Sequence, residues 1–265
     1  MKTPHWQGQS AIVTGASSGI GSAIAIDLAR AGAQLVLTGR RQQALEGVAS
    51  RCRELGGTAH TLACDLTVPE AREELSLLAR RAYGALDLLV NNAGVTMNAR
   101  FSELDPQVLR TILEVNFFAA ADLTRIVLPD LIARRGRILV ISSVTGLVGT
   151  PTRTVYAASK HALHGLYEGL RVELRDHGVG VTIACPGYVA TPMRERALLA
   201  DGSLQGHDQA AGRRMLAPEE VSQRALRAAW HRKRLVKMGT ETYLARALSL
   251  VAPGLLERIL ARATR

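Results

Sequence analysis

Tyr156 and Lys160 lie four residues apart in the stretch Tyr-Ala-Ala-Ser-Lys, and Ser142-Ser143 lies shortly upstream at the end of an apolar run. Residues four apart on a helix share one face, so the lysine ammonium can lie beside the phenol. A free phenol has a pKa of roughly 10, too high for efficient proton transfer near neutrality, and a neighbouring cation lowers it. A tyrosine, a lysine and a hydroxyl group together suit proton transfer at a carbonyl or alcohol oxygen. The spacing alone is weak, because an ordinary surface helix can carry the same two residues.

A glycine-rich turn, Thr-Gly-Ala-Ser-Ser-Gly-Ile-Gly, occupies residues 14–21 between a strand-like and a helix-like stretch. Glycines let the backbone turn tightly and approach a pyrophosphate, which binds at the N-terminus of the following helix. The spacing is G-x-x-x-G-x-G rather than G-x-G-x-x-G. We predict a dinucleotide site here, with a plain glycine turn as the alternative.

Residues after the second and third predicted strands indicate which dinucleotide binds. Arg40 and Arg41 follow the second strand, and positions 38–40 hold no Asp or Glu. An acid there usually holds the ribose 2′-hydroxyl of NAD, whereas an arginine suits a 2′-phosphate. Arg40 therefore favours NADP(H), unless it is only a solvated residue at a helix start. Asp65 is placed to contact an adenine edge, although Asp65 or Thr67 could equally cap the next helix.

Two further polar sites follow the fourth predicted strand. Asn92, Ala93 and Gly94 combine an amide with small residues that permit close backbone approach to a cofactor. Asn116 lies in the middle of the next long helical stretch, where a buried amide needs hydrogen-bond partners. It organises a water or a backbone kink, or it is a satisfied core amide.

The elements that position these residues alternate between strand and helix. The predicted strands are short, β-branched and apolar on both faces, which indicates a parallel sheet covered by helices on both sides. We therefore predict an α/β fold: one Rossmann-like, doubly wound parallel sheet. The predicted strands are 9–14, 34–38, 58–64, 86–90, 137–141 and 180–185. The predicted helices are 22–31, 42–55, 69–83, 106–134 (bent or broken near Pro129) and 155–177.

Composition excludes several classes of protein. The chain has 265 residues, 47% of them hydrophobic and 21% charged, as in a soluble globular protein. Apolar runs fall short of the roughly 18 residues that span a bilayer, and the N-terminus has no apolar signal region, so we expect a cytoplasmic protein. Cys52, Cys64 and Cys185 are odd in number and widely spaced, which favours neither disulfides nor a metal site.

The formal net charge of +10 is concentrated near the C-terminus, where residues 212–265 hold 12 Lys or Arg and four acids. A basic segment can meet anionic lipid, nucleic acid or an acidic cofactor, or it can be a solvated surface. We expect no nucleic-acid partner.

Six motifs occur in one order over residues 9–192: TGASSGIG (14–21), NNAG (91–94), Asn116, ISS (141–143), YAASK (156–160) and PG-x-V-x-T (186–191). In these six motifs and in their order, the sequence resembles the short-chain dehydrogenase/reductase family. The resemblance implies that Tyr156 is the general acid or base and that Lys160 lowers its pKa and holds the nicotinamide ribose. It implies that Ser143, thirteen residues before the tyrosine, hydrogen-bonds the substrate oxygen, and that Asn116 holds a water linking Lys160 to solvent.

The resemblance also implies where the cofactor lies, with no metal involved. Pro186 and Gly187 would abut the nicotinamide, and Thr191 would contact its carboxamide. The implied cofactor contacts are Gly15, Ser17, Ser18, Gly19, Ile20, Gly21, Arg40, Arg41, Asp65, Leu66, Asn92, Ala93, Gly94, Tyr156, Lys160, Pro186, Gly187, Val189 and Thr191.

We divide the single predicted domain, residues 1–265, into a cofactor-binding and catalytic core (9–190), a substrate lid (191–217), a last helix and strand (218–240) and a C-terminal extension (241–265). The extension alternates apolar residues with arginine and is broken at Pro253-Gly254, which predicts two amphipathic helices. In outline it is similar to the tails of family members that reduce long-chain ketones; subunit contact or a membrane surface are alternatives. Ser17 stands where some NADP-preferring members carry a basic residue, which leaves the 2′-phosphate to Arg40 and Arg41.

We therefore expect an NADP(H)-dependent oxidoreductase that interconverts a ketone and a secondary alcohol, and that forms a homodimer or homotetramer. Thr145, Val148, Tyr188 and Met193 suggest a small, partly apolar carbonyl or alcohol substrate. Two alternatives stay open: a reductase of lipid-like, long-chain 3-keto compounds at a membrane surface, and a non-catalytic NADP(H)-binding sensor.

Overall fold

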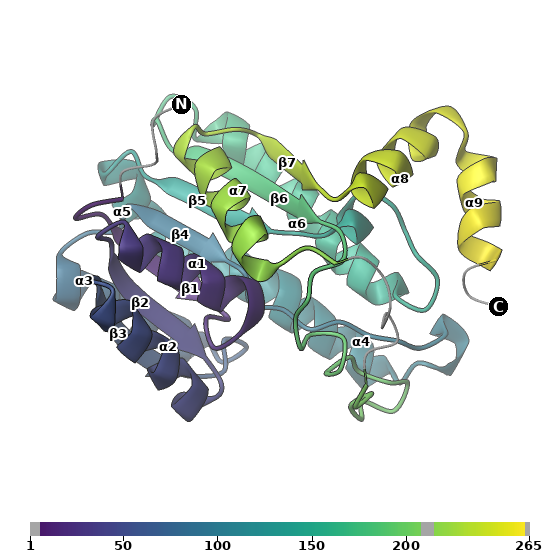
Figure 1. The fold of residues 1–265 in the computed structure, drawn as a ribbon, viewed down its shortest axis with the longest axis horizontal. Helices are drawn as coiled ribbons and strands as arrows, with labels where there is room; N and C mark the ends of the chain where they lie inside the picture. The colour runs from purple at the N-terminus through teal and green to yellow at the C-terminus, as the bar shows by residue number, and fades with distance from the viewer. Residues whose placement is uncertain (1–5, 208–214, 263–265) are drawn as a thin grey trace.

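A seven-stranded parallel sheet in the order β3-β2-β1-β4-β5-β6-β7 forms the centre of the protein (Figure 1). It is seen in a computed structural model that describes residues 6–207 and 215–262. The strands are β1 (Ser10–Thr14), β2 (Gln34–Gly39), β3 (Thr58–Ala63), β4 (Leu88–Asn91), β5 (Arg137–Ile141), β6 (Gly180–Pro186) and β7 (Leu235–Met238). The helices are α1 (Gly19–Arg30), α2 (Gln42–Glu54), α3 (Pro69–Tyr83), α4 (Pro106–Leu113), α5 (Ala119–Ala133), α6 (Thr154–Glu173), α7 (Pro218–Trp230), α8 (Thr240–Val251) and α9 (Pro253–Arg262).

Helices cover both faces of the sheet because successive strand residues point to opposite faces and both sets are apolar. Val13 of β1 belongs to the core under α1, α2 and α7, whereas the preceding Ile12 belongs to the core under α3, α5 and α6. Figure 1 shows α1, α2 and α7 in front of the sheet. The predicted doubly wound α/β fold is confirmed, with the strand boundaries displaced by at most two residues.

The long helical stretch after β4 differs from its prediction. Its irregularity is a π-helical turn at Glu114–Phe118, between α4 and α5, and the predicted break near Pro129 is wrong. Pro129 removes one backbone hydrogen bond, but α5 continues through it because Val127 and Leu131 are buried on either side. The π turn instead surrounds Asn116, whose buried side chain bonds to neighbouring segments.

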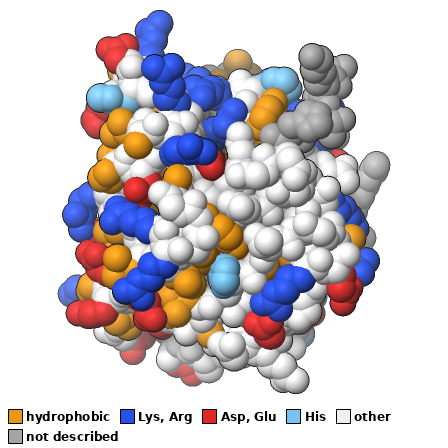
Figure 2. Space-filling view, turned by 90° about the vertical axis from the view of Figure 1, so that its left-hand side faces the viewer, with side chains coloured by type: hydrophobic (Ala, Val, Ile, Leu, Met, Phe, Trp, Pro, Cys, Tyr) orange, Lys and Arg blue, Asp and Glu red, His pale blue; other side chains and the backbone are white. Residues whose placement is uncertain are grey.

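After β7 the chain forms α8 and α9, as predicted, and they separate just before Pro253 because proline disfavours helical geometry in the residue before it. Figure 1 shows both helices on the side of the molecule away from α2 and α3. On the opposite side, basic and acidic side chains are interspersed among apolar ones (Figure 2). Within the described ranges, no helix has the length and apolar character needed to cross a bilayer.

Candidate active site

One cavity of about 1140 Å³ lies at the carboxyl ends of the strands, where ligands bind in doubly wound sheets. It extends from the loops after β1 and β2 to helices α6, α8 and α9. Of the predicted site residues, Gly21 and Asn116 lie behind its surface. The others all line it: Gly15, Ser17, Ser18, Gly19, Ile20, Arg40, Arg41, Asp65, Leu66, Asn92, Ala93, Gly94, Ser143, Tyr156, Lys160, Pro186, Gly187, Val189 and Thr191.

The glycine turn leaves room for a ligand group and packs tightly behind it. Gly15 and Gly19 have positive φ angles of 63° and 59°, which residues with a side chain rarely adopt. A Cβ atom at Gly21 would lie 2.3 Å from the Gly15 carbonyl oxygen, so Gly21 fits helix packing rather than ligand contact. Ser18 precedes α1 without a capping side-chain bond. The Ser18 side chain thus does not cap the first amides of α1, and their role as the pyrophosphate site stays a prediction.

Thr14 and Asn92 brace this turn against the β4 loop. The Thr14 hydroxyl donates to the Val90 carbonyl oxygen (3.1 Å) and accepts from the backbone N–H groups of Asn92 (2.9 Å) and Ala93 (3.0 Å). The Asn92 amide donates to the Thr14 carbonyl oxygen at 2.8 Å. Thr14 was not among the predicted site residues, although it opens the glycine motif.

Three arginines meet at the glycine-turn end of the cavity. Arg41 Nη2 donates to the carbonyl oxygen and hydroxyl of Ser17 (3.2 and 3.3 Å), so it supplies the cation that Ser17 itself lacks. Partial burial lowers the pKa of Arg41, and the charges of Arg196 and Arg40 lower it further. Arg196, from the segment after β6, was missed by sequence reasoning because no motif marks it.

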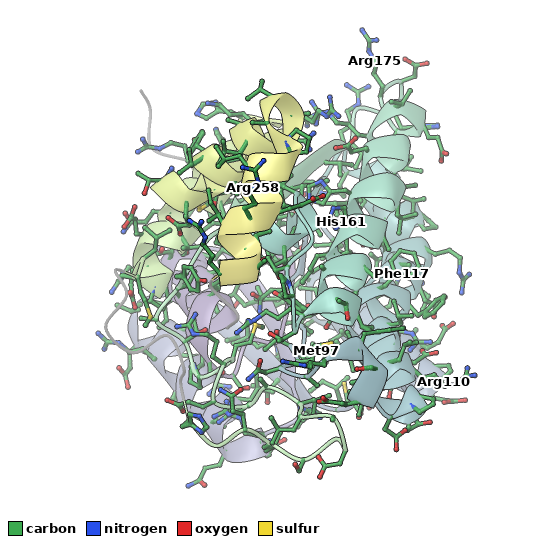
Figure 3. The ribbon with its side chains drawn as sticks, turned by 90° about the vertical axis from the view of Figure 1, so that its right-hand side faces the viewer. Met97, Arg110, Phe117, His161, Arg175 and Arg258 are labelled. Atoms are coloured by element: carbon green, nitrogen blue, oxygen red, sulfur yellow. The ribbon has the colours of Figure 1, made fainter. Side chains whose placement is uncertain are left out.

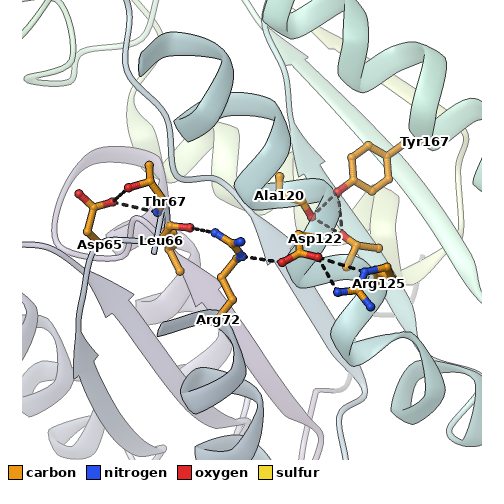
Figure 4. A network of polar contacts seen from close by, with 9 residues as sticks. Asp65, Leu66, Thr67, Arg72, Ala120, Asp122, Arg125 and Tyr167 are labelled. Carbon is orange, nitrogen blue, oxygen red and sulfur yellow. Dashed lines mark hydrogen bonds and ion pairs between the residues drawn. The ribbon is translucent and has the colours of Figure 1, made fainter. Parts of the chain in front are cut away.

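Asp65 and Leu66 lie in a loop that is fixed by hydrogen bonds from neighbouring side chains. Asp65 Oδ1 accepts from the backbone N–H and hydroxyl of Thr67, both at 2.9 Å, so its carboxylate closes a turn; Val68 is the N-cap residue of α3. Arg72 donates to the Leu66 carbonyl oxygen and, at 2.8 Å, to Asp122 of α5 (Figure 4). This network fixes the loop against α3 and α5.

Tyr156 and Lys160 share one face of α6, as predicted, and both are buried, with 6% and 3% of their surfaces exposed. Lys160 Nζ lies 5.7 Å from the centre of the Tyr156 ring and donates to the Ile141 carbonyl oxygen at 3.0 Å. Burial lowers the pKa of Lys160 to about 8, against a small opposing effect of Cys185. Burial raises the pKa of Tyr156, while a hydrogen bond with Ser143 and the charge of Arg153 act in the opposite direction. The pKa of Tyr156 therefore lies above its ordinary value because desolvation dominates, and its lowering by Lys160 stays a prediction.

The two adjacent serines have different surroundings. Ser143 caps the short helix at Val144–Gly146, and its Oγ accepts from the Thr145 backbone N–H at 3.2 Å. Ser142 also lines the cavity, but its Oγ lies 3.1 Å from His164 Nε2. Of the two serines, it is Ser143 whose side chain acts to lower the pKa of Tyr156, and its role at the substrate oxygen stays a prediction.

Asn116 is almost completely buried in the π turn and is satisfied by protein groups. Its Oδ1 accepts from the Val95 backbone N–H at 2.8 Å, and its Nδ2 donates to the Val95 carbonyl oxygen and to Ser159 Oγ, both at 2.9 Å. Both amide hydrogens are thus used, and one acceptor position of Oδ1 remains for a water. The water role stays a prediction.

The predicted lid and the C-terminal extension both meet the other end of the cavity. In the lid, the Leu198 N–H donates to the Thr96 carbonyl oxygen and its carbonyl oxygen accepts from Asn98, each at 2.9 Å; residues 208–214 lie outside the described part of the chain. From the extension, Glu241 Oε1 accepts from the Tyr188 backbone N–H at 3.0 Å. Sequence reasoning missed Glu241, because nothing near it in sequence marks a partner 53 residues away. Among the described residues, no cluster of His, Cys, Asp or Glu could hold a metal ion.

Comparisons with known proteins match most of the chain. A family model described as short chain dehydrogenase matches residues 9–201. Dehydrogenase/reductase SDR family member 7B of Bos taurus is 35% identical over 262 residues, covering 96% of this chain and 81% of that protein. Dehydrogenase/reductase SDR family member 7 of Homo sapiens is 36% identical over 208 residues, covering 76% and 61%. A solved short chain dehydrogenase/reductase from Burkholderia phymatum, in complex with NAD, has a TM-score of 0.80 and 27% identity and covers 91% of this chain and 92% of its own.

Proposed function

Because the chain belongs to the short-chain dehydrogenase/reductase family of oxidoreductases, we propose that it interconverts a ketone and a secondary alcohol with NADP(H). One observation carries the proposal. Tyr156, Lys160 and Ser143 line the same cavity as the glycine turn, so a dinucleotide on that turn would extend toward a proton donor.

The proposed chemistry divides between cofactor and protein. When bound, the reduced nicotinamide supplies a hydride to the carbonyl carbon, and the two electrons of the C=O π bond pass to the oxygen. Ser143 donates a hydrogen bond to that oxygen, and Tyr156 gives it the phenolic proton. Lys160, with a pKa of about 8, is mostly charged at neutral pH, and its N–H groups beyond the one bonded to Ile141 remain for a ribose hydroxyl and the tyrosinate.

The arginine cluster supports NADP(H) over NAD(H). Arg40, Arg41 and Arg196 all line the cavity at the glycine turn. Three neighbouring cations repel one another, and a 2′-phosphate would relieve that repulsion by forming charge-assisted hydrogen bonds. The structurally similar Burkholderia phymatum protein is in complex with NAD, so both cofactors must be compared directly.

The test is oxidation of NADPH and of NADH by the purified protein across a panel of ketones, with Tyr156→Phe as the control. We expect ketone-dependent oxidation that is faster with NADPH and is lost in the variant. Tight NADPH binding without turnover of any ketone would contradict the proposal and favour a cofactor-binding sensor.

A further inference from the structure

Helices α8 and α9 close the end of the cavity opposite the glycine turn. Apart from Glu241 in the first turn of α8, their contribution is apolar and follows helical spacing, so each helix presents one apolar stripe. The apolar lining residues are Leu244, Ala245 and Leu248 from α8 and Leu256, Ile259 and Leu260 from α9. Figure 3 shows α9, which carries Arg258, on the same side of the molecule as His161 of α6. We call these six residues the α8–α9 wall.

The wall leaves apolar surface uncovered inside the cavity. Leu244 and Ile259 are 61% and 45% exposed, and Leu204 of the predicted lid, which lines the same cavity, is 61% exposed. Arg246, Arg258 and Arg262 belong to the same two helices but lie outside the lining. The helices therefore direct leucine and isoleucine inward and keep their arginines out of the site.

Hydrogen bonds at the start of α8 hold the wall in place relative to the catalytic residues. Glu241 accepts from the Tyr188 backbone N–H at 3.0 Å, and the Thr242 hydroxyl donates to the Met238 carbonyl oxygen at 2.8 Å. Tyr188 follows Pro186 and Gly187 at the end of β6, beside the predicted nicotinamide position. A substrate whose carbonyl reaches Tyr156 thus has the α8–α9 wall as its neighbour in the same cavity.

We propose that the α8–α9 wall binds the hydrocarbon chain of the substrate, so that the enzyme acts on ketones and alcohols with a long apolar chain. This inference rests on the proposed function. Burial of each methylene removes apolar surface from water, so kcat/KM rises about three- to fourfold per methylene until the chain covers the wall.

The test is a series of straight-chain methyl ketones of increasing length, reduced with NADPH. Wild-type kcat/KM should rise with chain length, and Leu248→Gln and Leu260→Gln should flatten the rise by lowering kcat/KM more for long ketones than for short ones. Ala245→Phe fills the cavity without introducing a polar group and should likewise lower kcat/KM more for long ketones than for short ones. The matched controls are Leu250→Gln on α8 and Leu255→Gln on α9, which lie outside the cavity lining and are exposed.

Calorimetric titration of a long-chain methyl ketone into the NADP⁺-saturated protein gives a readout that needs no turnover. We expect binding that is weaker in Leu248→Gln and unchanged in Leu250→Gln. If no ketone is reduced but this pattern of binding holds, the proposed function fails and the wall stands. If wild-type kcat/KM does not depend on chain length and the long-chain ketone does not bind, the proposal that the α8–α9 wall binds the substrate chain is wrong. Binding of the same proteins to vesicles of phosphatidylcholine and phosphatidylserine tests the alternative of a membrane surface. The proposal also fails if only Leu250→Gln and Leu255→Gln have an effect and that effect is loss of vesicle binding, because the two helices would then bind a membrane.

Discussion

Glu241 Oε1 accepts the backbone N–H of Tyr188 at 3.0 Å and lies where a side chain at position 187 would have to go, 1.7 Å from a Cβ atom built on Gly187. The C-terminal extension is therefore joined to the end of β6, which the family resemblance places beside the nicotinamide. A glycine at position 187 is what allows the carboxylate so close.

Removal of that carboxylate should loosen α8. We expect Glu241→Ala to lower the free energy of unfolding by about 1–2 kcal/mol, since a hydrogen bond to a charged group is lost and the Tyr188 N–H is left without this acceptor. Glu241→Gln keeps an acceptor oxygen and should recover most of the loss. Urea unfolding of the three proteins measures both effects, and equal losses in Ala and Gln variants would show that the hydrogen bond is not the cause.

Tyr156→Phe should retain NADPH affinity and lose turnover by at least about a hundredfold, because the phenol is the proposed proton donor and the ring is kept. Single-turnover NADPH oxidation and a separate NADPH titration measure the two quantities. Near-normal turnover would rule out Tyr156 as the acid.

Cofactor choice should depend on the charge at position 40. Arg40→Asp is expected to lower the NADP⁺/NAD⁺ ratio of kcat/KM by about ten- to a hundredfold, because a charge-assisted contact with the 2′-phosphate becomes a repulsion. Arg175→Asp makes the same charge change at an exposed site beyond the C-terminal end of α6 and should leave the ratio unaltered. A ratio that is the same in all three proteins would mean that Arg40 does not select the cofactor.

The buried ammonium of Lys160 should make stability depend on pH. Its pKa is about 8 in the folded protein and near 10.5 when unfolded, so the unfolded state binds more protons between these values. The free energy of unfolding therefore rises with pH across that window. Below pH 8 the folded protein carries the full free-energy cost of burying the charged Lys160 ammonium. Lys160→Met should be more stable than wild type at pH 7 by about 2 kcal/mol, after a loss of about 1 kcal/mol for the Ile141 hydrogen bond.

The stability difference between Lys160→Met and wild type should be smaller at pH 9.5, because the wild-type lysine is then mostly neutral in the folded protein. Urea unfolding at pH 7 and 9.5, without cofactor, checks it. Parallel pH profiles for the two proteins would show that Lys160 is not desolvated as described.

Replacement by alanine should have opposite effects on stability at two helical glycines. Gly21→Ala places a Cβ 2.3 Å from the Gly15 carbonyl oxygen, so we expect a loss of about 1–3 kcal/mol in stability and weaker NADPH binding. At Gly47 of α2 a Cβ meets nothing within 4 Å, and Gly47→Ala should stabilise by about 1 kcal/mol. Thermal unfolding and NADPH titration separate the two. Unimpaired NADPH binding by Gly21→Ala would contradict the tight packing behind the turn.

Local rules were enough to predict the sheet and the shared helix face of Tyr156 and Lys160. Alternation along a strand depends on adjacent residues, so the apolar character of Ile12 and Val13 already indicated a sheet covered on both faces. The same holds for Tyr156 and Lys160, whose shared face follows from helical periodicity alone. These features are carried by a few consecutive residues, and that is why the sequence by itself determined them.

Only the tertiary structure decided what depends on distant segments. Burial makes the pKa of Tyr156 higher and that of Lys160 lower, and burial is produced by the elements packed around α6. Arg196 reaches the Arg40 end of the cavity, and Glu241 reaches Tyr188, through folding of segments far apart in the chain. Desolvation and long-range hydrogen bonds arise from which segments meet in space, and no short pattern of residues encodes that.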